Sequence, residues 1–236
     1  MAAEESPHPW CRRREPRYDG TMGVISYAFI VAAGYLLGGI PTAFLIGRLW
    51  GVDIRRVGSG NVGATNALRT LGWKAGITVM ALDVAKGYLA AGLLPLLPVW
   101  EGERVYLGMA AGVAAILGHV FTPYLRFRGG KGVAAAAGVL AALAPLPTAI
   151  AAGAFALVAF GTGIVSLASL TAAVALPVAA FLLDRTAAYA VHPAVRAVTV
   201  GLVPFIFYTH RQNIRRLIAG KENRFRRPWE RRSGRG

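Results

Sequence analysis

Long apolar runs dominate this sequence and decide where it can fold. Several runs of about twenty residues carry almost no charge, and a helix of that length crosses a hydrocarbon core about 30 Å thick. Hydrophobic residues make up 55% of the chain and charged residues only 16%, a balance that a water-soluble domain would struggle to keep off its surface. We therefore predict an all-α integral membrane protein, with no room between the runs for a separate soluble domain.

The apolar runs define about seven transmembrane helices joined by glycine-rich loops. The stretch from Pro147 to Leu183 is too long for one crossing at about 1.5 Å per residue, and Gly161 and Gly163 offer a break that divides it in two. The expected spans are 24–46, 74–98, 104–122, 132–146, 148–163, 165–183 and 193–208.

The same runs place a membrane domain at 23–223, between an N-terminal extension at 1–22 and a basic tail at 224–236. The extension lacks the apolar centre of a secretory signal and mixes both charge signs with proline, so we expect it to be disordered. Because Met22 opens the first apolar run, we hypothesise that translation begins there.

The basic residues are distributed in a way that favours a lipid surface and phosphorylated ligands over nucleic acid. The net charge is +15, but the Lys and Arg residues lie between and after the apolar runs rather than along one soluble face. Counting crossings places the loops 47–73 and 123–131 and the tail after Tyr208 on one side, which holds most of the positive charge. The positive-inside rule makes that side cytoplasmic. The four arginines of the extension would then lie outside, which conflicts with this topology unless the chain starts at Met22.

The first polar segment, GSGNVGATNALR at 58–69, predicts a phosphate-binding loop that runs into a short helix capped near Thr65 or Asn66. Glycines let successive backbone N–H groups converge on phosphate oxygens, and a helix N-terminus favours an anion. The alternative is a flexible loop between two helices. The residues expected to contact phosphate through backbone or side chain are Gly58, Ser59, Gly60, Asn61, Gly63, Thr65, Asn66 and Arg69.

The glycine spacing of this segment also matches a dinucleotide-binding fingerprint, with Asp83 at the expected distance. We reject that interpretation because the residues before Gly58 are polar and basic rather than a buried strand, and Asp83 falls within a span. A Walker loop is excluded because no lysine follows Gly63.

The second segment, HVFTPYLRFRGGKG at 119–132, predicts another anion site. Gly129, Gly130 and Gly132 would bring the backbone close to a ligand, and Lys131 would supply a compact positive charge at the head of the next helix. Two interpretations stay open for its other polar residues. Arg126 and Arg128 bind the ligand or anchor the chain in the interface, and His119 is a site residue or a packed histidine near a helix end.

The third segment begins at Tyr208 and predicts a span that continues into a basic amphipathic helix. His210 and Asn213 are three residues apart and so share a helical face, which would look into the site. Lipid headgroups would then be contacted by Arg211, Arg215 and Arg216. Glu222, an acid in a basic tail, would orient Arg or Lys partners; the alternative is a helix that only lies on the membrane surface.

Other ionisable residues limit the chemistry further. Asp83 and Lys86 lie three residues apart inside an apolar run, so we expect an ion pair that supports the first loop. The single cysteine, Cys11, rules out an intrachain disulfide and a cysteine metal cluster. None of the four histidines is followed five residues later by Asp, a pairing used by acyltransferases that take acyl-CoA or acyl-carrier protein, and no Ser-His-Asp arrangement is evident.

Together these segments resemble the bacterial acyl-phosphate:glycerol-3-phosphate acyltransferase family, commonly called PlsY. The similarity is close at GSGNVGATNALRTLG, LDVAKG, GHVFTPYLRFRGGKGVA and THRQNIRRLIAGKEN, and extends over about 23–223. It implies a seven-helix enzyme of the bacterial inner membrane, monomeric, without metal or cofactor, whose site and C-terminus are cytoplasmic. The implied reaction transfers an acyl group from acyl phosphate to the sn-1 hydroxyl of glycerol 3-phosphate and gives lysophosphatidic acid and phosphate, the first step of phospholipid synthesis.

The resemblance also implies roles for individual residues. Catalytic roles fall to Ser59, Arg69, Lys131, His210 and Asn213, and substrate or phosphate contacts to Gly58, Gly60, Asn61, Gly63, Thr65, Asn66, Gly129, Gly130, Gly132 and Glu222. An acyl phosphate already carries a good leaving group, so the main task is to hold two anions together and align a hydroxyl with the carbonyl. The general base is either His210 or an oxygen of the donor phosphate, with His210 then binding the acceptor.

Two other classes of protein would share these features. A transporter for an organic phosphate would use the same basic loops, but would accumulate its substrate in vesicles without forming an acylated product. A non-catalytic lipid-binding membrane protein would tolerate the loss of Ser59 and Arg69 without a biochemical phenotype.

Overall fold

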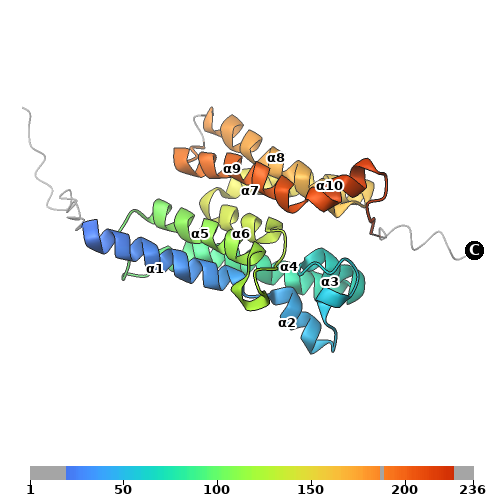
Figure 1. Ribbon diagram of the computed structural model, residues 1–236. Helices are drawn as coiled ribbons and strands as arrows, with labels where there is room; N and C mark the ends of the chain where they lie inside the picture. The colour runs from blue at the N-terminus through green and yellow to red at the C-terminus, as the bar shows by residue number, and fades with distance from the viewer. Residues whose placement is uncertain (1–19, 187–188, 226–236) are drawn as a thin grey trace, which may run out of the picture.

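The computed structural model describes residues 20–186 and 189–225, and within them all regular structure is helical, as the sequence predicts (Figure 1). The first helix begins at Gly20, so most of the expected extension at 1–22 and of the tail at 224–236 lies outside the described residues. The α-helices are α1 (Gly20–Gly39), α2 (Thr42–Leu49), α3 (Ala64–Thr70), α4 (Trp73–Tyr88), α5 (Arg104–Val120), α6 (Val133–Leu143), α7 (Pro145–Thr162), α8 (Val165–Asp184), α9 (Pro193–Thr209) and α10 (Arg211–Ile218).

Five helical stretches of the described chain are long and apolar enough to cross a membrane: Thr21–Leu49, Trp73–Leu96, Arg104–Leu125, Pro145–Thr162 and Val165–Asp184. The apolar helices α6 and α9 have 11 and 17 residues and are shorter. At 1.5 Å per residue α6 is about 16 Å long, roughly half the thickness of the hydrocarbon core. The protein is therefore a multi-pass membrane protein, but helix length alone does not support the expected number of seven spans.

Two breaks in the apolar runs have clear local causes. The run expected to form one span at 24–46 is interrupted after α1, because Pro41 has no N–H to continue the helix, and α2 sets off in a new direction at Thr42. The expected break in the second half of the chain is confirmed at Gly163, which ends α7 with a φ of 74° that glycine adopts without strain. Across this break the Thr42 N–H donates to the Ile40 carbonyl oxygen at 3.0 Å.

Small residues bring the helices of the first half of the chain into close contact. An ideal Cβ placed on Gly34, Gly38 or Gly118 would collide with main-chain atoms across the α1–α5 contact. Gly87 and Gly138 play the same part between α4 and α6. Contact between backbones is how helices associate when lipid removes the hydrophobic driving force. This packing gives the loops at the ends of α4 and α5 a rigid support.

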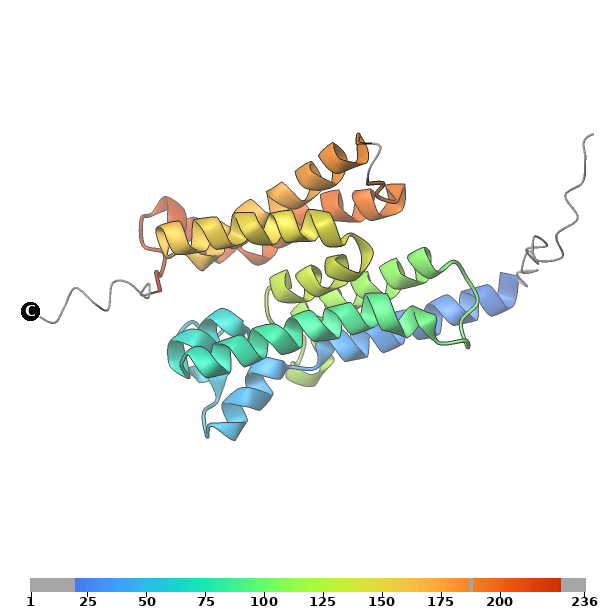
Figure 2. The ribbon, with the colours of Figure 1, turned by 180° about the vertical axis from the view of Figure 1, so that it is seen from behind.

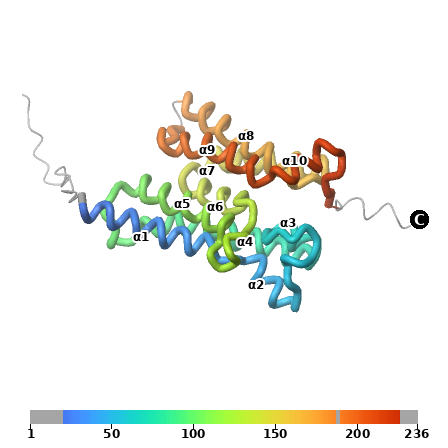
Figure 3. The backbone as a smooth tube through the Cα atoms, in the orientation of Figure 1, coloured from blue at the N-terminus to red at the C-terminus, as the bar shows by residue number. Residues whose placement is uncertain are grey.

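The helices form two groups. Helices α1 to α6 lie together, and α7 to α10 lie beside them as a second group, in both the front and the rear view (Figures 1 and 2). The backbone trace places α2, α3 and α10 at the end of the molecule away from the start of α1 (Figure 3). The short helices of the two groups therefore lie at the same end of the molecule.

Candidate active site

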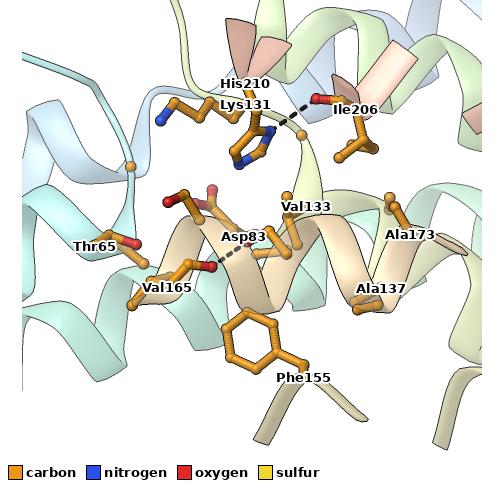
Figure 4. A pocket seen from close by; sticks show the side chains of 18 of the residues that line it. Thr65, Asp83, Lys131, Val133, Ala137, Phe155, Val165, Ala173, Ile206 and His210 are labelled. Carbon is orange, nitrogen blue, oxygen red and sulfur yellow. Dashed lines mark hydrogen bonds between the residues drawn. The ribbon is translucent and has the colours of Figure 1, made fainter. Parts of the chain in front are cut away.

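A cavity of about 370 Å³ lies between the two groups of helices and is lined by residues from all three polar segments. This confirms that the three segments meet on one side of the molecule. At one end the lining is polar, with Thr65, Lys131 and His210 close together, and further along it is apolar, with Ala137, Phe155 and Ala173 (Figure 4). Such a site suits a ligand with a charged head and an apolar chain.

The loop before α3 is held in shape by Asn66, whose side chain is 1% exposed. Its Nδ2 donates to the carbonyl oxygens of Ile54 and Val57, both at 3.1 Å, and its Oδ1 accepts from the Ser59 N–H at 3.0 Å. The expected cap near Thr65 or Asn66 is wrong, because the N-cap of α3 is Gly63 and no side chain caps it. Both amide hydrogens of Asn66 are used inside the loop, so Asn66 shapes the loop rather than donating to a phosphate.

The loop presents a defined set of groups to the cavity. Ser59, Asn61, Gly63, Thr65 and Arg69 line it, whereas Gly58 and Gly60 do not. Those two glycines have φ values of 61° and 69°, which shape the turn behind the lining residues.

Arg69 has unused hydrogen-bonding capacity at the polar end of the cavity. Its Nη2 donates to the Asn223 carbonyl oxygen at 3.2 Å, while its Nε is buried and has no hydrogen-bond partner within the described part of the chain. Burial lowers the pKa of Arg69, with Glu222 acting in the opposite direction. A buried donor without a partner is costly unless a ligand accepts from it, so Arg69 is well placed to bind an anion.

The second polar segment folds back onto the end of α5. The Gly129 N–H donates to the Val120 carbonyl oxygen at 2.9 Å and the Gly130 N–H to the His119 carbonyl oxygen at 3.0 Å. Of the residues expected to contact phosphate, Lys131 and Gly132 line the main cavity, whereas Gly129 and Gly130 line a small space behind it. Gly129 and Gly130 therefore support Lys131 in this conformation, and their N–H groups are not directed at the cavity.

Glu222 lies at the centre of a network that reaches Lys131. Its carboxylate accepts from Asn213 Nδ2 at 2.7 Å, from Ser166 Oγ at 3.0 Å and from Arg216 Nε at 2.7 Å. The Oδ1 atom of Asn213 in turn accepts from Lys131 Nζ. Glu222 therefore orients cationic partners, as its sequence context suggests, and has no free capacity of the kind that would bind a phosphate.

Two residues of this network differ from the sequence-based expectation. Arg216 was expected to face lipid headgroups, but it turns inward to Glu222. Ser166 was not singled out, since a serine near the start of an apolar helix gives little signal; it is 6% exposed and lines the cavity. Only the distant pairing with Glu222 reveals its role.

The polar end is electropositive. Arg69, Lys131 and Arg216 line it against the carboxylates of Glu222 and Asp83, and Asp83 is already paired with Lys86, so positive charge is in excess. Burial lowers the pKa of Lys131 to about 8, with Glu222 opposing and Arg216 and Arg69 adding to the effect. Although burial works against it, hydrogen bonds from Arg216, Asn213 and Ser166 hold the pKa of Glu222 below its ordinary value. A surplus of buried positive charge favours a bound anion.

His210 follows the last residue of α9 and is 2% exposed. Its Nδ1 lies 2.9 Å from the Ile206 carbonyl oxygen, so Nδ1 carries the proton and Nε2 is the acceptor (Figure 4). Burial, and then the charge of Lys131, lower the pKa of His210 to about 4. The imidazole is therefore neutral at physiological pH and can accept a hydrogen bond inside the cavity.

The other end of the cavity is lined mostly by apolar side chains, and the few hydroxyl groups there form hydrogen bonds within their own helices. The hydroxyl groups of Thr148 and Ser169 donate to the carbonyl oxygens of Ala144 and Val165 in their own helices, at 2.8 and 2.9 Å. The remaining lining residues there come from α6, α7, α8 and α9 and are mostly Ala, Val and Leu. No three His, Cys, Asp or Glu side chains in 20–186 and 189–225 come together as metal ligands would.

Comparison with known proteins identifies the family. The family model described as "Glycerol-3-phosphate acyltransferase" matches residues 28–220. The chain belongs to the glycerol-3-phosphate acyltransferase family. A protein of that name from Chlorobium phaeobacteroides (strain BS1) is 43% identical over 223 residues, covering 83% of this chain and 94% of the relative. One from Trichlorobacter lovleyi is 42% identical over 199 residues, covering 84% and 97%.

Two solved structures have the same fold. Both are crystal structures of PlsY, an integral membrane glycerol 3-phosphate acyltransferase, one in a glycerol 3-phosphate form and one in a lysophosphatidic acid form. They match with TM-scores of 0.75 and 0.74 at 37% and 36% identity, and each match covers 85% of this chain and 96% of the other. The glycerol-3-phosphate acyltransferase fold therefore extends over nearly all of the described helices.

Proposed function

We propose that this protein transfers an acyl group from an acyl phosphate to the sn-1 hydroxyl of glycerol 3-phosphate and so forms lysophosphatidic acid and phosphate. One observation supports this most directly: a single cavity joins an electropositive end to an apolar arm, in a chain of the glycerol-3-phosphate acyltransferase family. The polar end suits two phosphate groups, and the apolar arm suits the acyl chain. The solved relatives in glycerol 3-phosphate and lysophosphatidic acid forms correspond to the acceptor and the product.

The chemistry requires little from the protein beyond placement and charge. The acceptor hydroxyl oxygen attacks the acyl carbonyl carbon, an oxyanion forms, and the bond from that carbon to the phosphate oxygen breaks, so that phosphate leaves with the electron pair. Arg69 and Lys131 would neutralise the phosphate charges, and loop N–H groups, with Ser59 and Asn213, would align donor and acceptor. The released hydroxyl proton then has two possible acceptors.

We infer that a donor phosphate oxygen takes this proton rather than His210. Burial and the charge of Lys131 lower the pKa of His210 to about 4, which makes its imidazole a weak base, whereas the donor phosphate oxygens are anionic and belong to the reacting group itself. His210 Nε2 would accept a hydrogen bond from the acceptor and so bind it. Gly63, Thr65, Asn61 and Gly132 remain candidates for contact with phosphate.

The setting of the reaction is part of the same proposal. Residues 23–223 would form the catalytic unit of a monomer in the bacterial inner membrane, with the extension and the tail lying outside that unit. The basic loops that meet at the site would face the cytoplasm, because positively charged segments are retained on that side.

The direct test is phosphate release by the purified full chain in lipid vesicles, with palmitoyl phosphate present and glycerol 3-phosphate added or omitted. Acceptor-dependent release, with lysophosphatidic acid formed in equal amount, is the expected result. Uptake of glycerol 3-phosphate into vesicles without an acylated product would instead indicate a transporter. Unchanged acceptor-dependent release by Ser59→Ala and Arg69→Ala would remove these residues from the mechanism. Neither release nor uptake by folded wild-type protein would favour a non-catalytic lipid-binding protein.

A further inference from the structure

A second buried polar cluster forms part of the cavity wall and is centred on Asp83 of α4, which is 1% exposed and lines the cavity together with His119. Its Oδ1 accepts from Thr42 Oγ1 at 2.6 Å, pairs with Lys86 Nζ at 2.9 Å and lies 3.4 Å from His119 Nδ1. Lys86 also donates at 2.8 Å to the Ile40 carbonyl oxygen, which lies at the break before Pro41 and also accepts from the Thr42 N–H. The expected Asp83–Lys86 pair is thus confirmed. Through the contacts of Asp83 with Thr42 and His119, the cluster joins α2, α4 and α5.

The orientation of His119 follows from this cluster. Because its Nδ1 faces a carboxylate, Nδ1 carries the proton and the Nε2 end of the ring points away from Asp83. That end lies against Gly130: an ideal Cβ on Gly130 would collide with His119 Nε2 and would lie 2.9 Å from Cε1. The Asp83 carboxylate therefore determines which edge of the imidazole meets the second glycine-rich loop.

Gly130 is required by this contact and not by its own backbone conformation. It is not among the glycines with positive φ, so alanine could adopt the same dihedral angles. The position is closed on both sides, by the His119 ring and by the Val62 carbonyl oxygen, which would lie 3.0 Å from an added Cβ. Gly130 is thus the point where the first polar loop, the second polar loop and the end of α5 come together.

We propose that Asp83 and His119 are positioning residues that set the place of Lys131 in the active site through Gly130. The imidazole edge and the two N–H bonds from Gly129 and Gly130 to the end of α5 fix the peptide that carries Lys131, so a displaced ring displaces the cation. This inference rests on the proposed acyltransferase function, because it concerns placement for that reaction. It deepens the function by adding two cavity-lining residues that act on the reaction through the placement of Lys131.

A double-mutant cycle between His119 and Gly130 tests the contact. His119→Asn keeps an N–H donor near the position of Nδ1 and removes the far edge of the ring, whereas Gly130→Ala adds the colliding Cβ. Alone, Gly130→Ala should lower kcat about 100-fold, the size of effect expected from a displacement of about 1 Å. In the His119→Asn background the alanine fills the vacated space, and the further loss should be under about fivefold, a coupling of more than tenfold.

The control is Gly201→Ala on α9, where an added Cβ would meet nothing within 4 Å. It should change kcat by the same small factor with and without His119→Asn. The same cycle measured on the Tm in detergent should show the coupling too, since relief of a collision also restores stability. If wild-type protein is active and the factors by which the two single substitutions lower kcat multiply in the double variant, the positioning role is overturned. If wild-type protein is inactive, the proposed function is overturned, and the positioning role with it.

The part played by Asp83 is tested separately. Asp83→Asn alone would leave Lys86 as an uncompensated buried charge, so it is combined with Lys86→Met, which removes both charges together. We expect kcat to fall about tenfold while the KM for glycerol 3-phosphate changes little, since the amide oxygen that replaces the carboxylate holds the His119 ring by a weaker, uncharged hydrogen bond. Full retention of kcat in folded protein would overturn the role of Asp83.

Discussion

Two buried carboxylates organise this molecule, and their surroundings differ in a way that separates support from chemistry. Asp83 and Glu222 have side chains that are only 1% and 3% exposed, and each has three polar partners. Around Asp83, which also lines the cavity, the single lysine Lys86 balances the carboxylate at 2.9 Å. Around Glu222 three cations face the open cavity, and one carboxylate cannot neutralise them.

The contrast shows why burial of charge alone does not mark an active site. A cluster whose positive and negative side chains cancel gains little from binding a charged ligand. A cluster with excess positive charge is stabilised when an anion binds. The prediction that follows is that substitutions around Glu222 act on turnover directly, and substitutions around Asp83 act through the loop that carries Lys131. The distinction would be wrong if substitutions around Glu222 acted only through the Lys131 loop, or if substitutions around Asp83 acted on turnover directly.

Lys131→Ala should give the largest effect, because it removes the one cation that links Glu222, through Asn213, to the cavity. We expect turnover to fall about 1000-fold in protein that remains folded, in line with the loss of a preorganised charge at a reacting phosphate. The measurement is acceptor-dependent phosphate release, with the exposed Lys221→Ala as a matched control that keeps wild-type activity. Full activity of Lys131→Ala would exclude the lysine from the reaction.

Arg69→Lys should rank next. The substitution keeps the charge but removes the buried Nε donor and the planar fork, which a lysine cannot replace. We expect kcat/KM to fall about tenfold to a hundredfold. The control is Arg56→Lys, whose side chain is 85% exposed and which should behave as wild type. Equal values for the Arg69 variant and wild type would show that only the charge matters.

Much of this arrangement could be predicted from the sequence because it depends on local patterns. The apolar runs predict the helices to within a few residues, and glycines interleaved with polar donors predict both loops that approach the cavity. The break at Pro41 was missed, because a proline among apolar residues is also tolerated inside a membrane helix and the run gives no other sign of ending.

The rest depends on contacts between residues far apart in the chain. The Ser166 and Glu222 side chains meet although they are 56 residues apart, and no local pattern indicates this pairing. His119 could be read as a site residue or as a packed histidine until Asp83 and Gly130 were placed on either side of its ring. Gly130 is a second example. From the sequence it is expected to contact phosphate, whereas in the structure glycine is required there because the His119 ring leaves no room for a Cβ.

Glu222→Gln should shift the pH profile more than it lowers the maximal rate. The charge of Glu222 raises the pKa of Lys131 against the effect of burial, which leaves that pKa at about 8. If turnover needs the protonated lysine, wild-type activity should fall as pH rises through about 8. Without the Glu222 charge the same fall should begin at lower pH, while the amide oxygen still accepts from Asn213.

The measurement is kcat/KM for the Glu222→Gln variant and the wild type between pH 6 and about 11, a range that contains the ordinary lysine pKa. A basic limb at the same pH in both proteins would mean that Glu222 acts only through its hydrogen bonds. The surplus of positive charge would then not be the feature that distinguishes the two clusters.

The smallest effect concerns the acid side of the profile and decides what His210 does. A base with a pKa of about 4 is already deprotonated at pH 5, so His210 should add no limb between pH 5 and 7. The substrate phosphates, which lose their second proton near pH 6, should produce the limb seen there. His210→Gln should therefore raise the KM for glycerol 3-phosphate about tenfold, through loss of one hydrogen bond to a charged ligand, and leave that limb in place. Disappearance of the limb in the variant would instead make His210 the base, and its environment would then have to raise its pKa once the substrate anions are bound.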